Sequence, residues 1–374
     1  MTQQPAATTT RLLSLDVFRG ITIALMIIVN TPGNRENYAQ LDHSAWNGCT
    51  LTDLVFPFFL FISGVSVVFS LSKRLAKGET SGLIPQILKR ALIIYALGMV
   101  LNAIPNYHPS TLRILGVLQR IAICYFISSL LFLKTGLRAQ IAIAVTALVG
   151  YWLAMTYIPV PGFGAGVLTK EGNLAAWLDR AVLGAHTYRS GPYDPEGILS
   201  TVPALATALL GVFTGLWLKS AKQHVEKLKG LLAAGLVLAS VGWFWGGFFP
   251  INKALWTSSY VLFTAGLALW LLSFCYWLIE IKDIRAWGKP FEIFGINAIA
   301  AYMLPILVLK FLVYYPIHLA GSAEPQQLRI ILCDHIFGTW LSPVNASAAF
   351  AFSYTLLWLG VFGLLYRKKI FVKI

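Results

Sequence analysis

Charged residues are scarce in this sequence. They make up 12% of its 374 residues, whereas soluble domains carry about 25%. Apolar runs of roughly 20 residues recur along the chain, and each is long enough to cross the hydrocarbon core of a bilayer as a helix. The low charge excludes an ordinary soluble domain, and the apolar runs predict an all-α polytopic membrane protein.

Acidic residues are fewer than basic ones, 15 against 29, so the net charge is +14. Such a balance is typical of some nucleic-acid-binding proteins, but here the lysines and arginines lie at the ends of predicted helices rather than in one patch. We therefore expect no nucleic-acid partner. The basic residues instead indicate how the chain is oriented in a membrane.

Cysteine occurs only four times and in no paired motif. This spacing predicts neither a disulfide framework nor a zinc site, and we expect no metal. The first residues also lack the basic segment of a signal peptide, and no cleavage site follows the first apolar run. We therefore expect a flexible tail over residues 1–10, followed by a retained membrane helix.

The apolar runs predict a bundle of about ten membrane spans, in a single domain over residues 1–374. The predicted spans are 14–31, 52–72, 87–104, 114–133, 139–158, 199–218, 230–249, 256–279, 291–314 and 345–366. Alternate loops are much richer in lysine and arginine, which places these loops in the cytoplasm. Both termini then lie in the cytoplasm, and the loop that holds His43 lies on the outer side.

Polar residues within spans are costly and indicate functional sites. Asp16 and Arg19 lie three residues apart, so they share a helix face and can pair. That pair either anchors its helix at the inner interface or helps to bind an anionic ligand. Gln119 and Arg120 are a second pair of polar residues within a predicted span.

His43 lies between the first two predicted spans, and Asn30 ends the first of them. Histidine suits proton transfer near neutral pH, and an amide can donate to a developing oxyanion. This combination suits acyl transfer, although a lone interfacial histidine is more often structural. Asp53 either caps the second helix, because Thr50 to Asp53 has the spacing of a capping box, or orients His43.

Two further polar motifs fall in the outer loops. Asp194 and Glu196 belong to "YDPEG", which predicts either a site for an amino-bearing substrate or a turn that ends in a helix cap. Lys253 and Trp256 belong to "INKALW". They are either interfacial anchors or part of an outer polar site.

Six motifs in order resemble one known family. They are "SLDVFRGITIALMIIVN", "HSAWNGCTLTDLVFPFFLFISG", "GVLQRIAICYF", "YDPEGILSTVPA", "INKALWTSSYVLFTAG" and the terminal "KKIFVKI". Together they resemble the heparan-α-glucosaminide N-acetyltransferase family, including bacterial relatives associated with N-acetylglucosamine. The resemblance spans nearly the whole chain, from about residue 11 to residue 374.

This resemblance implies a membrane acetyltransferase that takes acetyl from cytoplasmic acetyl-CoA, as co-substrate, and passes it to an amino sugar on the far side. The essential histidine of the family matches His43, and its catalytic asparagine matches Asn30. On this hypothesis Arg19 and Arg90 bind the CoA phosphates. Gln119 and Arg120 line the path of the pantetheine arm, and Asp194 or Glu196 positions the sugar amine.

The chain lacks the large N-terminal domain of the animal enzyme, which favours a bacterial inner-membrane protein with its His43 loop in the periplasm. The expected partners are therefore membrane lipid, CoA and a glucosamine-type sugar or glycan, and the resemblance also implies a homodimer. The alternative function is a transporter of amino sugars or sugar oligomers. Against it, the sequence shows no matching pair of helices broken by glycine or proline in two halves.

Overall fold

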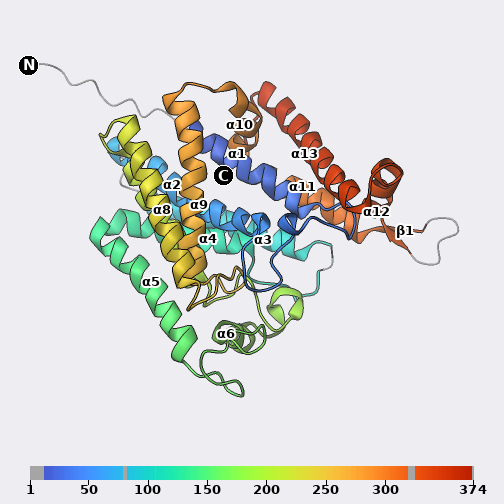
Figure 1. The fold of residues 1–374 in the computed structure, drawn as a ribbon, viewed down its shortest axis with the longest axis horizontal. Helices are drawn as coiled ribbons and strands as arrows, with labels where there is room; N and C mark the ends of the chain where they lie inside the picture. Colours follow the sequence, from blue (N-terminus) through green and yellow to red (C-terminus); the bar gives the residue numbers. More distant parts are fainter. Residues whose placement is uncertain (1–11, 79–81, 106, 319–324, 373–374) are drawn as a thin grey trace, which may run out of the picture.

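The computed structural model describes residues 12–78, 82–105, 107–318 and 325–372 (Figure 1). The predicted tail over residues 1–10 lies outside this part. The described α-helices are α1 (Leu13–Asn30), α2 (Leu51–Ala76), α3 (Leu83–Ala103), α4 (Val117–Lys134), α5 (Leu137–Tyr157), α6 (Leu174–Leu183), α7 (Thr201–Lys219), α8 (His224–Trp245), α9 (Ser258–Tyr276), α10 (Lys289–Ile296), α11 (Ala298–Tyr314), α12 (Leu328–Cys333) and α13 (Pro343–Arg367).

Short helical turns and one small sheet complete the described chain. The turns are η1 (Ala39–Leu41), η2 (Gly184–His186), η3 (Tyr188–Ser190), η4 (Trp277–Ile281), η5 (Ala286–Gly288) and η6 (Asp334–Gly338). The sheet pairs β1 (Pro316–Ile317) with β2 (Gln326–Gln327) in antiparallel register. The prediction of an all-α fold is therefore confirmed.

The membrane spans agree with the prediction in number. Nine helices of the described chain are long and apolar enough to cross a membrane, and the bent pair Ala286–Ile296 and Ala298–Tyr314 brings the total to as many as ten. The predicted span 291–314 is therefore broken: its two parts meet at 75°. The predicted span 230–249 begins earlier, at His224, because Gln223 and Glu226 form a capping box there.

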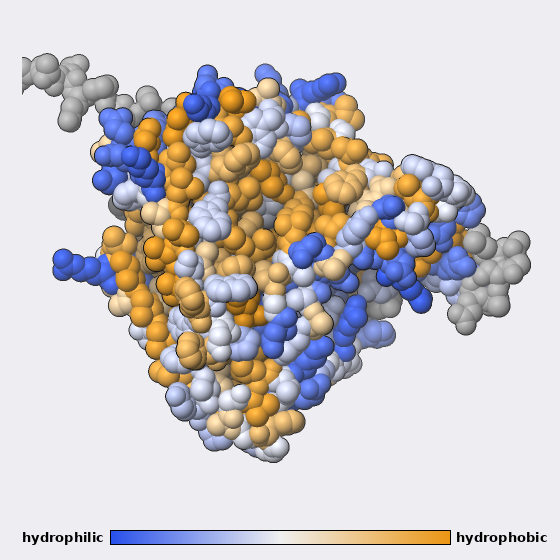
Figure 2. All heavy atoms as spheres, viewed as in Figure 1, coloured by the Kyte–Doolittle hydropathy of each residue, from blue (hydrophilic) through white to orange (hydrophobic). Residues whose placement is uncertain are grey.

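The helices form a central group and a peripheral group. In the hydrophobic windows of α1, α2, α7 and α9, 61–67% of the residues are buried inside the protein, against 22–33% in α3, α5, α8 and α13. The peripheral helices therefore expose apolar side chains, as lipid-facing helices do. Figure 2 shows apolar residues across much of one face, with hydrophilic residues at its upper edge and lower right.

Two glycines let the central helices α2 and α7 approach closely. A Cβ atom on Gly64 would collide with the backbone carbonyl of Ala208, and one on Gly211 with that of Phe61. Small residues at such crossings are how helices pack in membranes, where apolar burial alone supplies little attraction between helices. This contact fixes the first turn of α2, which carries Asp53, relative to the rest of the bundle.

Candidate active site

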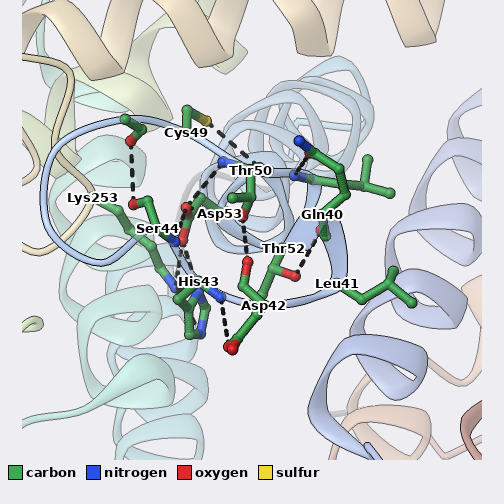
Figure 3. Close-up of polar contacts among 12 residues, drawn as sticks. Gln40, Leu41, Asp42, His43, Ser44, Cys49, Thr50, Thr52, Asp53 and Lys253 are labelled. Carbon is green, nitrogen blue, oxygen red and sulfur yellow. Dashed lines mark hydrogen bonds and ion pairs between the residues drawn. The ribbon is translucent and has the colours of Figure 1, made fainter. Parts of the chain in front are cut away.

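Asp53 lies in the first turn of α2, and its carboxylate has two kinds of partner. Oδ2 accepts the backbone N–H of Thr50 at 3.1 Å and completes a capping box. The same oxygen accepts the backbone N–H of Ser44 at 3.1 Å. Oδ1 lies 2.7 Å from Nδ1 of His43 (Figure 3). The sequence left open whether Asp53 caps α2 or orients His43. In the structure it caps the helix and also contacts the imidazole.

This contact sets the tautomer of His43. An ionised carboxylate only accepts hydrogen bonds, so Asp53 favours a proton on Nδ1 and leaves the lone pair on Nε2. Asp53 is buried, with 1% of its side chain exposed, whereas the His43 side chain is 52% exposed. The imidazole is therefore held from one side by a buried acid and accessible from the other.

Lys253 approaches the same imidazole from the loop between α8 and α9. Its Nζ lies 3.1 Å from Nδ1 and 3.3 Å from Nε2 of His43, and 3.7 Å from Oδ1 of Asp53. Figure 3 shows the Lys253 side chain reaching the His43 ring. Burial lowers the pKa of Lys253 below its ordinary value, while the charge of Asp53 acts in the opposite direction.

Hydrogen bonds hold this loop against the residues that follow His43. The N–H of Gly48 donates to the carbonyl of Ile251 at 2.7 Å, and Nδ2 of Asn252 donates to Oδ1 of Asn47 at 3.1 Å. Asn252 is itself fixed, because its N–H donates to Oγ1 of Thr257 at 3.0 Å. The position of Lys253 is thus set by the hydrogen bonds of the two residues that precede it, Ile251 and Asn252.

These groups open into a cavity of about 340 Å³, here called the His43 cavity. Asn30, the last residue of α1, also lines it. Among the described residues, none forms a hydrogen bond with the Asn30 side-chain amide, so this donor is available to a ligand. The structure therefore brings Asn30, His43, Asp53 and Lys253 together around one cavity. The sequence left open whether Lys253 belongs to a polar site or is an interfacial anchor.

The two acids of "YDPEG" are bound by Arg113, which the sequence analysis did not identify as a site residue. Nε of Arg113 donates to Oδ2 of Asp194 at 3.0 Å, and Nη2 contacts both Oδ1 of Asp194 and Oε2 of Glu196. Asp194 also accepts the backbone N–H groups of Tyr188 and Glu196. Asp194 is thus buried and occupied, while Arg113 and Glu196 line the His43 cavity.

The ion pair shifts the pKa of both partners that face the cavity. Burial alone would lower the pKa of Arg113, but Glu196 and Asp194 outweigh it and raise that pKa. Burial alone would raise the pKa of Glu196, but the nearby arginines Arg113 and Arg120 outweigh it and lower that pKa. Both groups therefore carry their charge, and each neutralises part of the other.

A second cavity of about 370 Å³ lies farther along the bundle and is here called the Arg90 cavity. Arg19 and Arg90 both line it. Nη1 of Arg19 lies 3.0 Å from Oδ1 of Asp16, which confirms the predicted pair, and Nη2 donates to Oγ of Ser66 at 2.9 Å. The guanidinium of Arg90 lies over the Tyr125 ring at 5.0 Å.

One donor in the Arg90 cavity is unused. Nε of Arg90 is buried and has no hydrogen-bond partner among the described residues. A buried N–H without a partner is costly, and a native protein that keeps one often does so for a ligand. The Arg90 cavity therefore has the charge that an anionic group requires, and this charge belongs to a residue whose Nε lacks a partner in the described chain.

Besides Asp194, three predicted site residues lie outside both cavities. Gln119 is buried against Sδ of Met99, with Nε2 at 3.6 Å. Arg120 donates to the carbonyl of Gly197 at 3.1 Å and to Oγ of Ser200 at 2.5 Å, and its guanidinium lies over the Trp256 ring at 5.1 Å. These contacts use Arg120 to hold the turn before α7, and neither Gln119 nor Arg120 lines either of the two cavities.

Trp256 is the third such residue. It is fully buried, packs edge-on against Phe56 with ring centroids 4.8 Å apart, and donates from Nε1 to Oγ1 of Thr207 at 3.2 Å. Its φ of 52° turns the chain from the Lys253 loop into α9. Trp256 thus positions the loop from within the core and does not face the His43 cavity.

The two cavities share one wall. Phe59 of α2 and Tyr302 of α11 line both of them. The two rings meet edge-on, with centroids 6.3 Å apart and planes at 87°. Chemically, the molecule combines a histidine with a lone pair on Nε2, an amide donor and, beyond an aromatic wall, the two arginines Arg19 and Arg90. Within the described ranges, no group of three or more His, Cys, Asp or Glu residues is arranged to hold a metal.

Comparison with known proteins gives matches over most of the chain. Residues 11–244 match the family described as "Heparan-alpha-glucosaminide N-acetyltransferase, catalytic". The heparan-alpha-glucosaminide N-acetyltransferases of Homo sapiens and Mus musculus are each 31% identical to the chain over 424 aligned positions. Each alignment covers 97% of this chain and 60% of the relative, so the chain spans about 60% of the length of these curated relatives.

Proposed function

Because the chain belongs to the heparan-α-glucosaminide N-acetyltransferase family, we propose that it transfers the acetyl group of acetyl-CoA to the amino group of a sugar across a membrane. Acetyl-CoA enters from the cytoplasm and the sugar from the far side. The human and mouse relatives are named for a glucosaminide of heparan. For this chain we propose a glucosamine-type sugar or glycan in the periplasm of a bacterium.

The observation that carries this proposal is the pair of cavities on either side of one aromatic wall. The Arg90 cavity holds two arginines, the His43 cavity holds a base, and both are lined by Phe59 and Tyr302. From Arg19 to Asn30 the helix α1 rises about 16 Å. A long acyl carrier bound in the Arg90 cavity therefore has to pass only this wall to present its thioester to His43.

The arginines favour CoA as that carrier. A guanidinium binds phosphate through parallel, charge-assisted hydrogen bonds. Arg90 has an unused Nε donor, and Arg19 faces the same space. The last turn of α2 holds Lys73 and Arg74, and the first half of α3 holds Lys89, so the basic residues gather at this end of the bundle. By the positive-inside rule this end faces the cytoplasm, where acetyl-CoA is made available.

Two routes of transfer fit the His43 cavity. In the first, Nε2 of His43 takes a proton from the sugar amine as the amine attacks the acetyl carbonyl. The C–S bond then breaks, and the CoA thiolate takes up the proton. In the second, Nε2 itself attacks the carbonyl to give an acetyl-imidazole and CoA thiolate. The sugar amine then displaces the imidazole, and the proton that the amine loses passes to the CoA thiolate. In both routes the Asn30 amide donates to the carbonyl oxygen as negative charge develops there.

Purified protein with acetyl-CoA and glucosamine tests the function. We expect N-acetylglucosamine by mass spectrometry, together with free CoA thiol in equal amount. We also expect micromolar CoA to raise the melting temperature with the dependence of a ligand that binds only the folded state. Uptake of amino sugar into proteoliposomes without CoA, combined with no acetylated product, would instead establish a transporter.

Labelled acetyl-CoA without acceptor separates the two routes. Label that stays on the peptide containing His43 after rapid quenching indicates the acetyl-imidazole route. Label found only after glucosamine is added, and only on the sugar, indicates direct transfer. The His43→Gln variant is the matched control, because its amide cannot form the covalent intermediate.

A further inference from the structure

We propose that Lys253 is a positioning residue that keeps the imidazole of His43 neutral, so that Nε2 retains the lone pair used in the reaction. The inference depends on the proposed function only for making His43 the reacting group. It starts from the distances: the Lys253 ammonium is nearly equidistant from the two ring nitrogens, at 3.1 and 3.3 Å. The sequence suggested that this residue is an interfacial anchor or part of an outer polar site, and neither role requires such a contact.

The single negative charge beside His43 balances only one positive charge, either on the imidazole or on Lys253. Asp53 supplies one negative charge at 2.7 Å from Nδ1 and 3.7 Å from Nζ of Lys253. The ordinary pKa of lysine lies about four units above that of histidine. Burial lowers the pKa of Lys253, but the charges of Asp53 and Glu196 oppose this effect. We therefore place the single proton that balances the carboxylate on the lysine. A second proton on the ring would place two cations 3.1 Å apart with only one anion between them.

In the part of the chain that the structure describes, no other charged group facing the ring upsets this balance. In the same loop, Asp42 is directed to the backbone, where its Oδ1 accepts the His43 N–H at 2.8 Å. Burial raises the pKa of the Cys49 thiol to about 12, so it is neutral. Across the cavity, Arg113 and Glu196 form an ion pair with each other. The local charge on His43 is therefore set by Asp53 and Lys253.

The geometry of the loop holds the Lys253 ammonium in one place beside His43. The Lys253 side chain is only 19% exposed, whereas an interfacial anchor extends into water or headgroups. The Gly48–Asn252 bridge joins its loop to the His43 loop. An ammonium held there has a further effect in the base-catalysed route. Once His43 has taken the proton of the amine, the adjacent cation disfavours that imidazolium and promotes transfer of the proton to the departing CoA thiolate.

The test measures the protonation of His43 without using acetyl transfer. Diethylpyrocarbonate modifies neutral imidazole, and the half-exposed His43 is accessible to it. The rate of modification of the peptide that contains His43 is followed by mass spectrometry from pH 5 to 9 in wild type, Lys253→Met and Lys253→Arg. In Lys253→Met, we expect the midpoint of the rate profile to move to higher pH by about one to two units. Lys253→Arg, which keeps the charge, should retain the wild-type midpoint.

Acetyl transfer gives the second readout. The acidic limb of kcat should move to higher pH in Lys253→Met and be restored in Lys253→Arg, whereas a merely structural role lowers kcat equally at every pH. An unchanged midpoint in a monodisperse Lys253→Met variant overturns the inference, and Lys253→Gln replaces that variant if it aggregates. A shifted midpoint in a protein that makes no acetylated sugar overturns the proposed function and leaves the inference standing.

Discussion

The His43 cavity and the Arg90 cavity are similar in volume, but they differ in whether the charged groups that line them have partners. In the His43 cavity each charged group has a partner: Lys253 lies beside Asp53, and Arg113 binds Glu196. In the Arg90 cavity, Arg90 presents a buried donor that no described residue satisfies. Paired charges suit chemistry in which a proton moves between groups, whereas an unsatisfied cation suits the binding of an anion.

The wall between them separates these two tasks. Phe59 and Tyr302 present aromatic surface to both cavities. Aromatic rings exclude water without contributing a charge of their own. On the proposed function, the arginines bind phosphate on one side of this wall without perturbing the balance around His43. The comparison therefore predicts that variants of one cavity affect binding of CoA, and variants of the other affect the transfer step.

The largest effect is expected from His43→Ala. Removal of the base should lower kcat for acetyl transfer by about a thousandfold, because neither proposed route proceeds without Nε2. The shift in melting temperature caused by CoA should remain, since the Arg90 cavity is untouched. His108→Ala is the control, because His108 is an exposed residue of another loop. Transfer by His43→Ala at near wild-type rates would remove His43 from the mechanism.

Arg90→Ala should show the reverse pattern. Loss of a charge-assisted contact to phosphate costs about 1.5–3 kcal/mol, which corresponds to a rise of about 10- to 100-fold in KM for acetyl-CoA. The value of kcat at saturating acetyl-CoA and the KM for the sugar should change little. Lys89→Ala removes a charge from the neighbouring position of α3, outside the Arg90 cavity. An equal rise in KM for both variants would show that only the general charge of this surface matters.

Tyr302→Ala should remove part of the wall between the two cavities and so connect them. Without the ring, water reaches a thioester bound beside Phe59, and we expect hydrolysis of acetyl-CoA in the absence of sugar to rise several-fold. Release of CoA thiol, followed with a chromogenic disulfide, measures this reaction. Tyr302→Phe keeps the ring and should keep hydrolysis low. If Tyr302→Ala hydrolyses no more acetyl-CoA than wild type, the wall does not separate the cavities.

Much of the site could be predicted from the sequence because its signals are local. The charge-poor runs predicted the spans, and the capping-box spacing placed Asp53 at the start of α2. Asp16 and Arg19 pair because they lie three residues apart on one helix. Asn30 and His43 were found by resemblance and by side-chain chemistry, and the structure brings them to one cavity.

The rest depends on contacts between distant segments. Arg113 binds the two acids of "YDPEG" from another loop, and no spacing in the sequence indicates that pairing. Arg120 and Trp256 appear polar or interfacial in the sequence but stack on each other in the core. Lys253 reaches His43 only because the loop before α9 pairs with Gly48. Each of these is a tertiary contact, so one-dimensional patterns of polarity cannot show which group a side chain meets.

The smallest expected effect comes from Asp179 of α6, which lies beside the paired acids but has a buried Oδ2 without a partner in the described chain. Burial raises the pKa of Asp179 to about 6, above the usual value of about 3.9 in an unfolded chain. The folded state therefore holds this proton more tightly, and the stability it contributes is lost as the pH rises from about 4 to about 6. Asp179→Asn keeps an acceptor for the Ile198 N–H and carries no charge. Its melting temperature should match that of wild type near pH 4 and exceed it by a few degrees above pH 6. If Asp179→Asn and wild type have equal melting temperatures at pH 7.5, the charge of Asp179 is compensated by nearby groups, as that of Glu196 is. Charge pairing would then extend through the whole region behind the His43 cavity.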